Sequence, residues 1–346
     1  MRTMTAAVLY GKEDVKIETV PVPEVAPGEV LIRVEAALTC GTDLKVYRRG
    51  YHAKMIVPPA LFGHELAGTI VEVGEGVRHW RAGDRVVALN SAPCGNCFFC
   101  QRGQENLCED LLFNNGAYAE FIRIPARIVA KNMLRVPDDM SFESAALTEP
   151  LACVVRGLDE LHPRKRDSVV IIGAGPIGLM FIQVARAYDM HVIAVVKRDE
   201  QVIAAKHFGA DDVVQITETD DPIAEVRALT NGRGADLAVE AIAQPLGWQW
   251  AVDMVRKGGA VNFFGGCASG TKVELDTNQI HYQELSLKAT FHHTPSAARK
   301  AFDLVRSGRV HGTDFITGKA PLTELETVLR RMMDRNGEIK TVILPR

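Results

Sequence analysis

Four cysteines that follow one another closely form the clearest group of metal-binding side chains. They are Cys94, Cys97, Cys100 and Cys108, separated by two, two and seven residues. Four thiolates with this spacing converge tetrahedrally on zinc at about 2.3 Å and leave no position for a substrate. An iron–sulfur cluster also uses four cysteines, but its usual bacterial run has a different last spacing and a following proline, where this chain has Glu109. The spacing therefore predicts a structural zinc site.

A second set of possible ligands is dispersed along the chain. Cys40 lies in LTCGTDLK, His64 and Glu65 in FGHELAG, and Glu149 in ALTEPLA. Each has an ordinary explanation, because a lone cysteine is often a small buried hydrophobe and a lone histidine or glutamate often lies on the surface. Adjacent His64 and Glu65 would face opposite sides of a regular strand, so binding one ion together requires an irregular turn, which Gly63 permits. Spacing alone leaves both a shared catalytic metal and unrelated side chains open.

A glycine-rich turn, GAGPIG, follows the apolar run VVII and opens a predicted helix. Gly173, Gly175 and Gly178 let the backbone approach a pyrophosphate, and Pro176 and Ile177 begin the helix whose N-terminus favours negative charge. A turn that merely ends a strand tightly is the alternative. The preceding strand, the following helix and the surrounding alternation of strands and helices favour dinucleotide binding.

The end of the next predicted strand bears on which dinucleotide is bound. Enzymes that use NAD carry an acidic residue about 20 positions after the glycines, which receives the ribose 2′-hydroxyl. Here that position holds Val196, and Lys197 and Arg198 follow. A guanidinium binds phosphate through parallel charge-assisted hydrogen bonds, so the sequence favours NADP over NAD. The alternative is that Lys197 and Arg198 face solvent and that Asp199 reaches the ribose.

These residues require two kinds of scaffold. Up to about residue 150, short alternating apolar runs predict a β-rich domain; they are AAVLY, EVLIRVEA, AGTIVEVG and DRVVAL. From Asp167, strand-like runs alternate with helical stretches, which predicts an α/β domain with a doubly wound parallel sheet. Its expected strands are SVVIIG, MHVIAVV, DDVVQI, ADLAVEA and AVNFFGG, and its expected helices are 177–188, 200–208 and 246–256. Beyond residue 285 we expect another strand, a helix over 296–307 and a final strand, TVILP.

Length and composition fit a globular protein. The 346 residues suggest two domains, and 47% hydrophobic with 24% charged residues excludes a disordered chain. A net charge of −3 gives no basic excess for nucleic acid, so the clusters at 48–49 and 164–166 are interpreted as solvated surface. The N-terminal segment lacks the apolar core of a signal peptide, and the longest nearly uncharged run, 169–185, is too short to cross a membrane. Seven cysteines without such a signal favour metal binding over disulfides and predict a cytoplasmic protein.

Together and in this order, the motifs resemble those of the zinc-containing medium-chain dehydrogenases, in particular the sorbitol (polyol) and threonine dehydrogenase branch. The matching pieces are CGTD at 40–43, GHE at 63–65, the four-cysteine loop, EPL at 149–151 and GAGPIG at 173–178. The resemblance implies a GroES-like catalytic domain over 1–152 and 290–346 and a Rossmann cofactor-binding domain over 153–289. It also implies a homotetramer.

The resemblance further implies roles for individual residues of the catalytic domain. Cys40, His64 and Glu65 would bind a catalytic zinc, and Glu149 would bind it directly or hold its water. Asp43 would orient the histidine ligand.

Proton transfer is implied to begin at Thr42, which would take the substrate proton. The family relay usually continues to a histidine three residues later, where this chain has Lys45. A lysine there either passes the proton on or lies in solvent while water does so, and we prefer the second interpretation. FHHTP at 291–295 replaces the arginine–tyrosine pair of many sorbitol dehydrogenases, and its imidazoles suit either a hydroxyl-rich ligand or structural packing.

The function implied is oxidation of a secondary hydroxyl of a small polar substrate, a polyol, sugar alcohol or cyclitol, with hydride transfer to NAD(P). A threonine or vicinal-diol (butanediol-type) dehydrogenase is the alternative among enzymes. From another class, the chain would be a non-catalytic zinc- and nucleotide-binding protein, but retention of an open ligand set argues against that. No nucleic-acid or membrane partner is expected.

Overall fold

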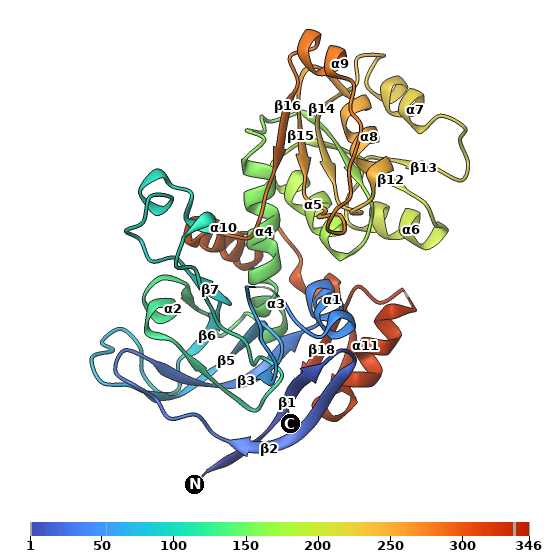
Figure 1. The fold of residues 1–346 in the computed structure, drawn as a ribbon. Helices are drawn as coiled ribbons and strands as arrows, with labels where there is room; N and C mark the ends of the chain where they lie inside the picture. The colour runs from blue at the N-terminus through green and yellow to red at the C-terminus, as the bar shows by residue number, and fades with distance from the viewer. Residues whose placement is uncertain (1, 53, 335–336, 346) are drawn as a thin grey trace. The chain divides into compact units, whose positions relative to one another are not determined.

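The computed structural model describes residues 2–52, 54–334 and 337–345, and it divides the chain into two compact units. One, here called the terminal unit, combines Met1–Ala152 with His293–Arg346. The other, the inserted unit, is the continuous segment Cys153–His292. Figure 1 shows the blue and red ends of the chain side by side in the terminal unit, where strand β18 pairs with β3.

The terminal unit is built mainly of β-strands. They are β1 (Thr3–Gly11), β2 (Asp14–Pro21), β3 (Val30–Leu38), β4 (Ala60–Leu61), β5 (Glu65–Val73), β6 (Arg85–Ala88), β7 (Ser91–Ala92), β8 (Leu112–Phe113), β9 (Phe121–Ile124), β10 (Met133–Arg135), β17 (Ile316–Pro321) and β18 (Lys340–Leu344). The main sheet has the order β10-β6-β5-β3-β18-β17, and β9 also pairs with β3. Because β3 is central, its sequence VLIRVEAAL is almost continuously apolar and buries residues on both faces.

Short helices connect these strands and carry several of the predicted site residues. They are α1 (Gly41–Arg49), α2 (Ala126–Lys131), α3 (Phe142–Ala146), α10 (Pro295–Arg306), α11 (Leu325–Met333) and α4 (Thr148–Asp159), which begins in this unit. The core beneath them includes Leu9, Ile32, Phe62 and the fully buried rings of Tyr47 and Tyr118. The alternating pattern of the first 150 residues had indicated strands but not α1 or α4, which place Thr42 and Glu149 in their first turns.

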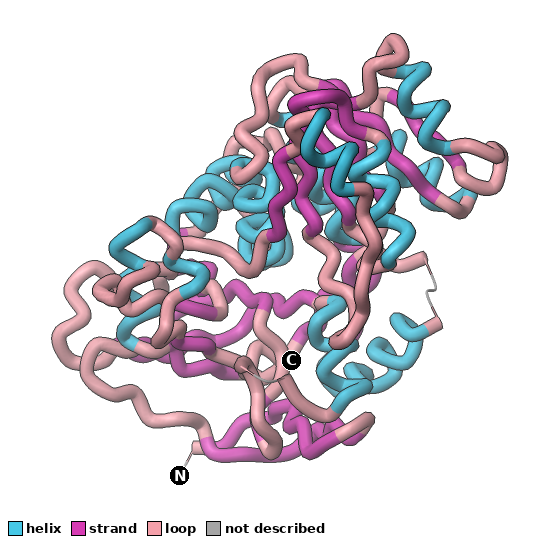
Figure 2. Tube along the Cα trace, turned by 45° about the horizontal axis from the view of Figure 1, so that its top comes forward, coloured by secondary structure: helices cyan, strands magenta, loops and turns pink. Residues whose placement is uncertain are grey.

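The inserted unit is a parallel sheet with helices along it. Its strands are β11 (Ser168–Ile172), β12 (His191–Val196), β13 (Asp212–Gln215), β14 (Ala235–Glu240), β15 (Val255–Phe263) and β16 (Ser286–Ala289), and its further helices are α5 (Pro176–Ala187), α6 (Asp199–His207), α7 (Pro222–Leu229), α8 (Pro245–Asp253) and α9 (Thr277–Tyr282). The strand order is β13-β12-β11-β14-β15-β16. Figure 2 shows these strands in magenta with the helices in cyan beside them. The strand order reverses between β11 and β14, and ligands bind beyond the carboxyl ends of strands at such a point.

The sequence prediction was wrong about where one helix of this unit ends and the next strand begins. The helix expected over 246–256 stops at Asp253, and β15 starts at Val255 rather than at the run AVNFFGG. The amide of Ala235 donates to the Met254 carbonyl at 2.9 Å, and Val255 pairs with Ala235 before a shift in register. This pairing with β14 is a long-range contact that the local apolar pattern does not contain.

No helix within the described ranges has both the length and the apolar character needed to cross a bilayer.

Candidate metal sites and cofactor turn

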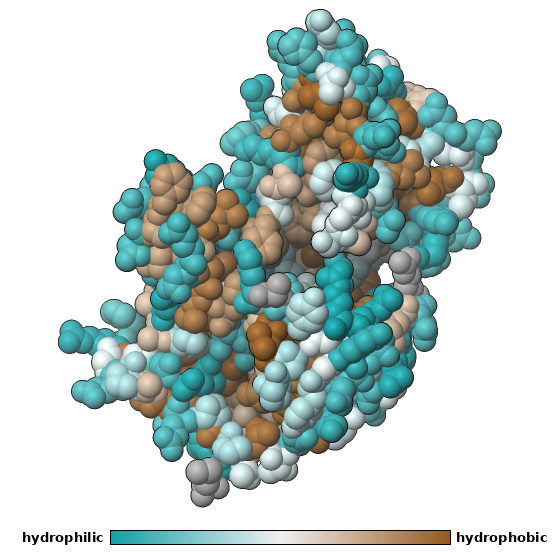
Figure 3. All heavy atoms as spheres, in the orientation of Figure 1, coloured by the Kyte–Doolittle hydropathy of each residue, from teal (hydrophilic) through white to brown (hydrophobic). Residues whose placement is uncertain are grey.

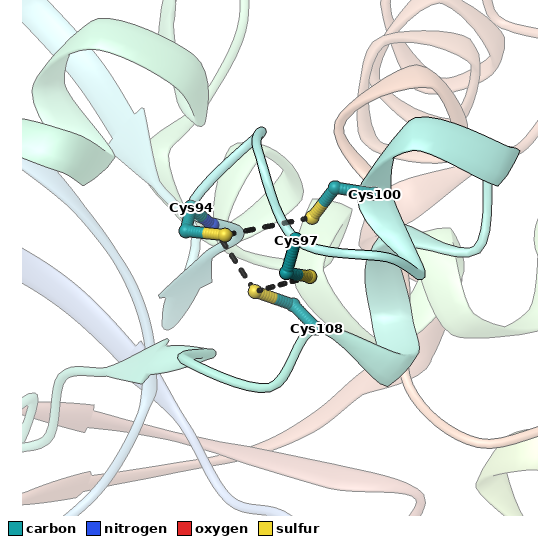
Figure 4. Close-up of side chains that lie close together, drawn as sticks. All are labelled: Cys94, Cys97, Cys100 and Cys108. Carbon is teal, nitrogen blue, oxygen red and sulfur yellow. Dashed lines mark hydrogen bonds between the residues drawn. The ribbon is translucent and has the colours of Figure 1, made fainter.

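The cysteine-rich loop folds into a compact lobe in which four sulfur atoms converge (Figure 4). The Cys94 and Cys100 sulfurs are 3.9 Å apart, as are the Cys97 and Cys108 sulfurs. Sulfur atoms about 2.3 Å from a central zinc lie about 3.8 Å apart at the corners of a tetrahedron, so the spacing fits this ion. The tight loop is possible because Gly95 has a φ of 90°.

Backbone amides make parts of this lobe ready to hold thiolates. Amides of Cys100 and Glu109 point at the Cys97 sulfur and lower the pKa of that thiol to about 6. Burial has the opposite effect on Cys100 and raises the pKa of its thiol to about 12. A metal ion binds the thiolate form of cysteine. Cys97 therefore favours that form before the ion binds, whereas Cys100 loses its proton only when the ion is present.

A second set of donors lies where α1 begins and β5 begins. Cys40 caps the N-terminus of α1, and its sulfur accepts from the Thr42 amide at 3.4 Å. The ligand atoms of Cys40, His64 and Glu65 all lie within 4.8 Å of one another. Gly63 makes this possible, because its φ of 88° turns the chain and a Cβ there would lie 2.6 Å from the Tyr118 ring. His64 therefore stands before the regular strand, and it faces the same space as Glu65.

His64 is oriented from behind by a carboxylate. Its Nδ1 atom lies 2.8 Å from Asp43 Oδ1, and the Tyr118 hydroxyl donates to Asp43 Oδ2 at 2.7 Å. Since a carboxylate only accepts, Nδ1 carries a proton, which leaves Nε2 as the nitrogen that would bind a metal once it is deprotonated. Burial lowers the pKa of His64, but Asp43 and Cys40 outweigh it and raise the value well above the ordinary one. The arrangement is the one that prepares histidine to bind a metal.

Glu65 is held by a cation from the far end of the sequence. Lys340, the first residue of β18, donates to Glu65 Oε2 at 2.6 Å and Oε1 at 2.9 Å, and also to the Thr39 carbonyl at 2.8 Å. Both side chains are buried. Burial raises the pKa of Glu65, and Lys340 and His64 oppose that effect. A carboxylate has about four lone-pair positions, so one can still face a metal while Lys340 fixes the others.

Glu149 is not part of this close set. It lies in the first turn of α4, with its Oε1 atom 3.7 Å from His293 Nε2, which in turn lies 3.1 Å from Asn90 Oδ1. Burial raises the pKa of Glu149 to about 7, and the charge of His64 acts against this rise. His293 itself is buried against Asn90 and Glu149, so the second histidine of FHHTP is packed in the interior.

Thr42 and Lys45 lie on α1 at different degrees of exposure. Thr42 is half-buried beside Cys40, whereas Lys45 is exposed one turn later.

The glycine turn adopts the geometry of a phosphate cradle. Gly173 has a φ of 101°, and a Cβ at Gly178 would lie 1.9 Å from the Gly173 carbonyl oxygen. Gly175 precedes α5 with no side-chain cap on the helix N-terminus, and a Cβ there would meet open space. Pro176 takes the first helical position, where its missing amide costs nothing, and Ile177 follows. The turn ends β11, at the point where the strand order reverses.

At the end of β12, position 196 would receive the cofactor ribose in an enzyme that uses NAD, and it holds no acidic residue here. Val196 is buried, Lys197 is exposed, and the Lys197 amide donates to Gln201. Asp199 accepts from Gln215 Nε2 at 2.7 Å, so this carboxylate is held against β13. Arg198 forms an ion pair with Glu200.

Two residues of the terminal unit that support the proposed metal ligands were not identified from the sequence. Tyr118 lies 75 residues from Asp43, and Lys340 lies 275 residues from Glu65. Neither stands in a local motif, and each contact depends on segments that are far apart in the sequence.

A thiol–imidazole–carboxylate set that could hold a metal, and a glycine turn at the switch point of a parallel sheet, are the features expected of a metal- and nucleotide-binding protein. Residues 26–138 match the family described as "Alcohol dehydrogenase GroES-like domain", and residues 176–307 match "Zinc-binding dehydrogenase". The chain belongs to the zinc-containing medium-chain dehydrogenases, as the resemblance and the predicted fold class had indicated.

Similar proteins cover nearly the whole chain. Sorbitol dehydrogenase of Bacillus subtilis is 32% identical over 99% of this chain and 98% of its own length. L-threonine 3-dehydrogenase of Bacillus licheniformis is 33% identical, with 96% of each chain covered. Among solved structures, a zinc-binding dehydrogenase of Sinorhizobium meliloti bound to NADP is 28% identical, with a TM-score of 0.90 and all of both chains covered. The chain is therefore a dehydrogenase that uses zinc and a pyridine nucleotide.

Proposed function

We propose that the protein oxidises a secondary hydroxyl of a polyol, sugar alcohol or cyclitol, with hydride transfer to a nicotinamide cofactor. The observation that supports this most is the set of Cys40, His64 and Glu65, with His64 Nδ1 occupied by Asp43 and Nε2 left for the metal. A zinc ion held there would lower the pKa of a bound hydroxyl and stabilise the alkoxide. Three protein donors leave a position for the substrate oxygen.

The remaining residues have roles in holding and moving the proton. Thr42 follows Cys40 closely, with its amide donating to the Cys40 sulfur, and its hydroxyl accepts the proton of the substrate hydroxyl. The exposure of Lys45 supports transfer onward to water rather than to this ammonium. Glu149, buried near His64, holds water or the substrate hydroxyl at the metal side. Cys94, Cys97, Cys100 and Cys108 bind a second zinc that stabilises their lobe.

Two further proposals concern the state of the protein. The close similarity to this family supports a homotetramer. All seven cysteines lie in the described part of the chain and none of them is in a disulfide, which supports a reducing compartment such as the cytoplasm.

A panel of substrates tests the proposed activity. The zinc-loaded protein is assayed with sorbitol, xylitol, ribitol, myo-inositol, L-threonine and 2,3-butanediol, each with NAD and NADP. We expect the highest kcat/KM with a polyol or inositol. L-threonine is the second candidate, because L-threonine 3-dehydrogenases are as similar to this chain as the sorbitol dehydrogenase is. A zinc-loaded protein that turns over none of these alcohols would contradict the proposal.

The cofactor proposal is NADP rather than NAD. It is supported by the buried Val196 at the acidic position, by the exposed Lys197 and the half-buried Arg198 after it, and by the contact that holds Asp199 against Gln215. A carboxylate that would repel a 2′-phosphate is thus absent from the end of β12, within the residues described.

Cofactor preference is measured as the ratio of kcat/KM values for NADP and NAD. We expect the wild type to favour NADP and Val196→Asp combined with Arg198→Ser to shift the ratio at least tenfold toward NAD. Lys206→Ser, which removes a cation from the last turn of α6, is the matched control. A wild type that prefers NAD, or a double variant whose ratio does not move, refutes the proposal.

A further inference from the structure

The exposed face of α1 carries positive charge directly beside the proposed catalytic residues. Cys40 caps this helix and Thr42 lies in its first turn. Lys45 and Arg49 follow Thr42 by three and seven positions, and at about 100° per residue the three fall within an arc of about 60°. One stripe of the helix therefore leads from the hydroxyl that handles the proton to two cations.

These cations have no acidic partner. Within the ranges that the structure describes, Lys45, Arg48 and Arg49 form no ion pair. The one acidic residue of α1, Asp43, is buried and engaged by His64 and Tyr118. In Figure 3, strongly hydrophilic residues cover the part of the surface where Figure 1 draws α1.

The loop that follows α1 places His52 near both these cations and the metal donors. His52 Nδ1 accepts the backbone amides of Lys54 at 3.2 Å and Met55 at 3.1 Å, which fixes the ring. Burial lowers the pKa of His52, and His64, Arg49 and Lys54 each lower it further. His52 thus feels both the metal-binding histidine and the cations, so these groups share one neighbourhood.

Stabilisation of the helix does not explain the whole arrangement. Cations in the last turn interact favourably with the helix dipole, which accounts for Arg48 and Arg49. Lys45 lies in the middle of the helix, where this effect has faded, and nothing in the described chain neutralises it.

We propose that Lys45 and Arg49 bind a phosphate at the end of the substrate remote from the reacting hydroxyl. This inference rests on the proposed function and specifies its substrate as a phosphorylated polyol. With a rise of about 1.5 Å per residue, the two Cα atoms lie about 4.5 and 10.5 Å along the helix from Thr42. The span fits a carbon chain of four to six atoms with its phosphate between an ammonium and a guanidinium.

Matched pairs of substrates test the inference with the zinc-loaded, full-length protein. The pairs are sorbitol and sorbitol 6-phosphate, ribitol and ribitol 5-phosphate, and xylitol and xylitol 5-phosphate. We expect at least one phosphate to have a KM about tenfold or more below that of its neutral partner. Added salt should weaken this preference, because the charges are exposed and screened.

Variants on α1 show which cations are responsible. Arg49→Gln and Lys45→Gln should each reduce the ratio of kcat/KM for the phosphorylated over the neutral partner by about tenfold. Arg48→Gln removes the same charge about 120° around the helix from Thr42 and should leave that ratio unchanged. All three positions are exposed, so melting temperatures should match the wild type.

The failure of this inference can be distinguished from failure of the proposed function. Turnover of neutral polyols with no preference for any phosphate overturns the inference and leaves the function standing. Equal effects of Arg49→Gln and Arg48→Gln on the ratio also overturn it. If no polyol is oxidised, phosphorylated or not, both are overturned.

Discussion

At the scale of single residues, the proposed catalytic site depends on groups that do not themselves bind metal. Asp43 fixes the proton of His64 on Nδ1, and Tyr118 in turn fixes Asp43. Lys340 holds Glu65 in a comparable way. Without these partners the imidazole and the carboxylate would each have to give up rotational freedom when the ion binds.

The first prediction concerns Asp43. Asp43→Asn should lower zinc affinity at this site about 10- to 100-fold, because the amide no longer favours the Nδ1–H form of His64. Zinc retained after dialysis against graded chelator measures the effect, and the four-cysteine lobe should keep its ion. Tyr118→Phe should show a smaller loss, since it leaves the carboxylate in place. Unchanged retention in Asp43→Asn would mean that this carboxylate does not support the metal.

Sequence reasoning reached the residues that stand in motifs but not those that support them. Cys40, His64 and Glu65 could be named because their short motifs occur in a known order, although their spacing did not join them. Tyr118 and Lys340 could not, because Tyr118 is brought to the site by backbone hydrogen bonds with Ala7 and Phe62, and Lys340 by the pairing of β18 with β3. The cluster at 48–49 was interpreted as solvated surface, and both arginines are exposed. That Lys45 and Arg49 share a face with Thr42 depends on the helix α1, which the sequence pattern did not indicate.

At the scale of elements, one half-buried carboxylate joins three strands of the inserted sheet. Asp236 on β14 accepts from the Ser168 amide at 2.8 Å on β11 and from Arg256 Nε at 2.6 Å on β15. Burial disfavours its ionised form, but these hydrogen bonds outweigh burial and lower the pKa of Asp236. The charge is therefore part of what holds the sheet in register.

The second prediction follows from that lowered pKa. A carboxyl whose pKa is lower in the folded state adds stability above its unfolded value, near 3.9, and loses it as the pH falls through the folded value. Asp236→Asn should reduce the free energy of unfolding at pH 7 by about 1–3 kcal/mol. The difference from wild type should narrow below about pH 4.

Urea unfolding at a series of pH values measures this difference. The exposed Asp220→Asn is the control and should show little change at any pH. If the loss of unfolding free energy in Asp236→Asn stays constant down to pH 3, the residue contributes through its shape and not through its charge.

At the scale of the whole molecule, the terminal unit contains two donor sets of different kinds. The four-cysteine lobe is closed by protein sulfur, whereas Cys40, His64 and Glu65 leave a position open. The third prediction is that removing a ligand from the four-cysteine lobe lowers stability, whereas removing a ligand from the open set abolishes activity. Cys97→Ser should lower the melting temperature by about 5 °C or more, because the lobe loses a metal that stabilises its fold.

His64→Ala should keep a melting temperature within about 3 °C of wild type and lose at least about 1,000-fold in kcat. Elemental analysis should find two zinc ions per wild-type chain and one in each variant. A fully active wild type with a single zinc would exclude the assignment of two sites.

The position of Lys340 also affects how the protein is made. The inserted unit is complete once residue 292 has been synthesised, so it can fold while the ribosome is still at work. The N-terminal part of the terminal unit, by contrast, exposes the end of β3 at Ala37 and Leu38 until β18 arrives to pair with it. An open strand edge invites pairing with other chains. We therefore expect chaperones to engage nascent chains stalled between residues 293 and 339, and to release them once the lysine that holds Glu65 has emerged.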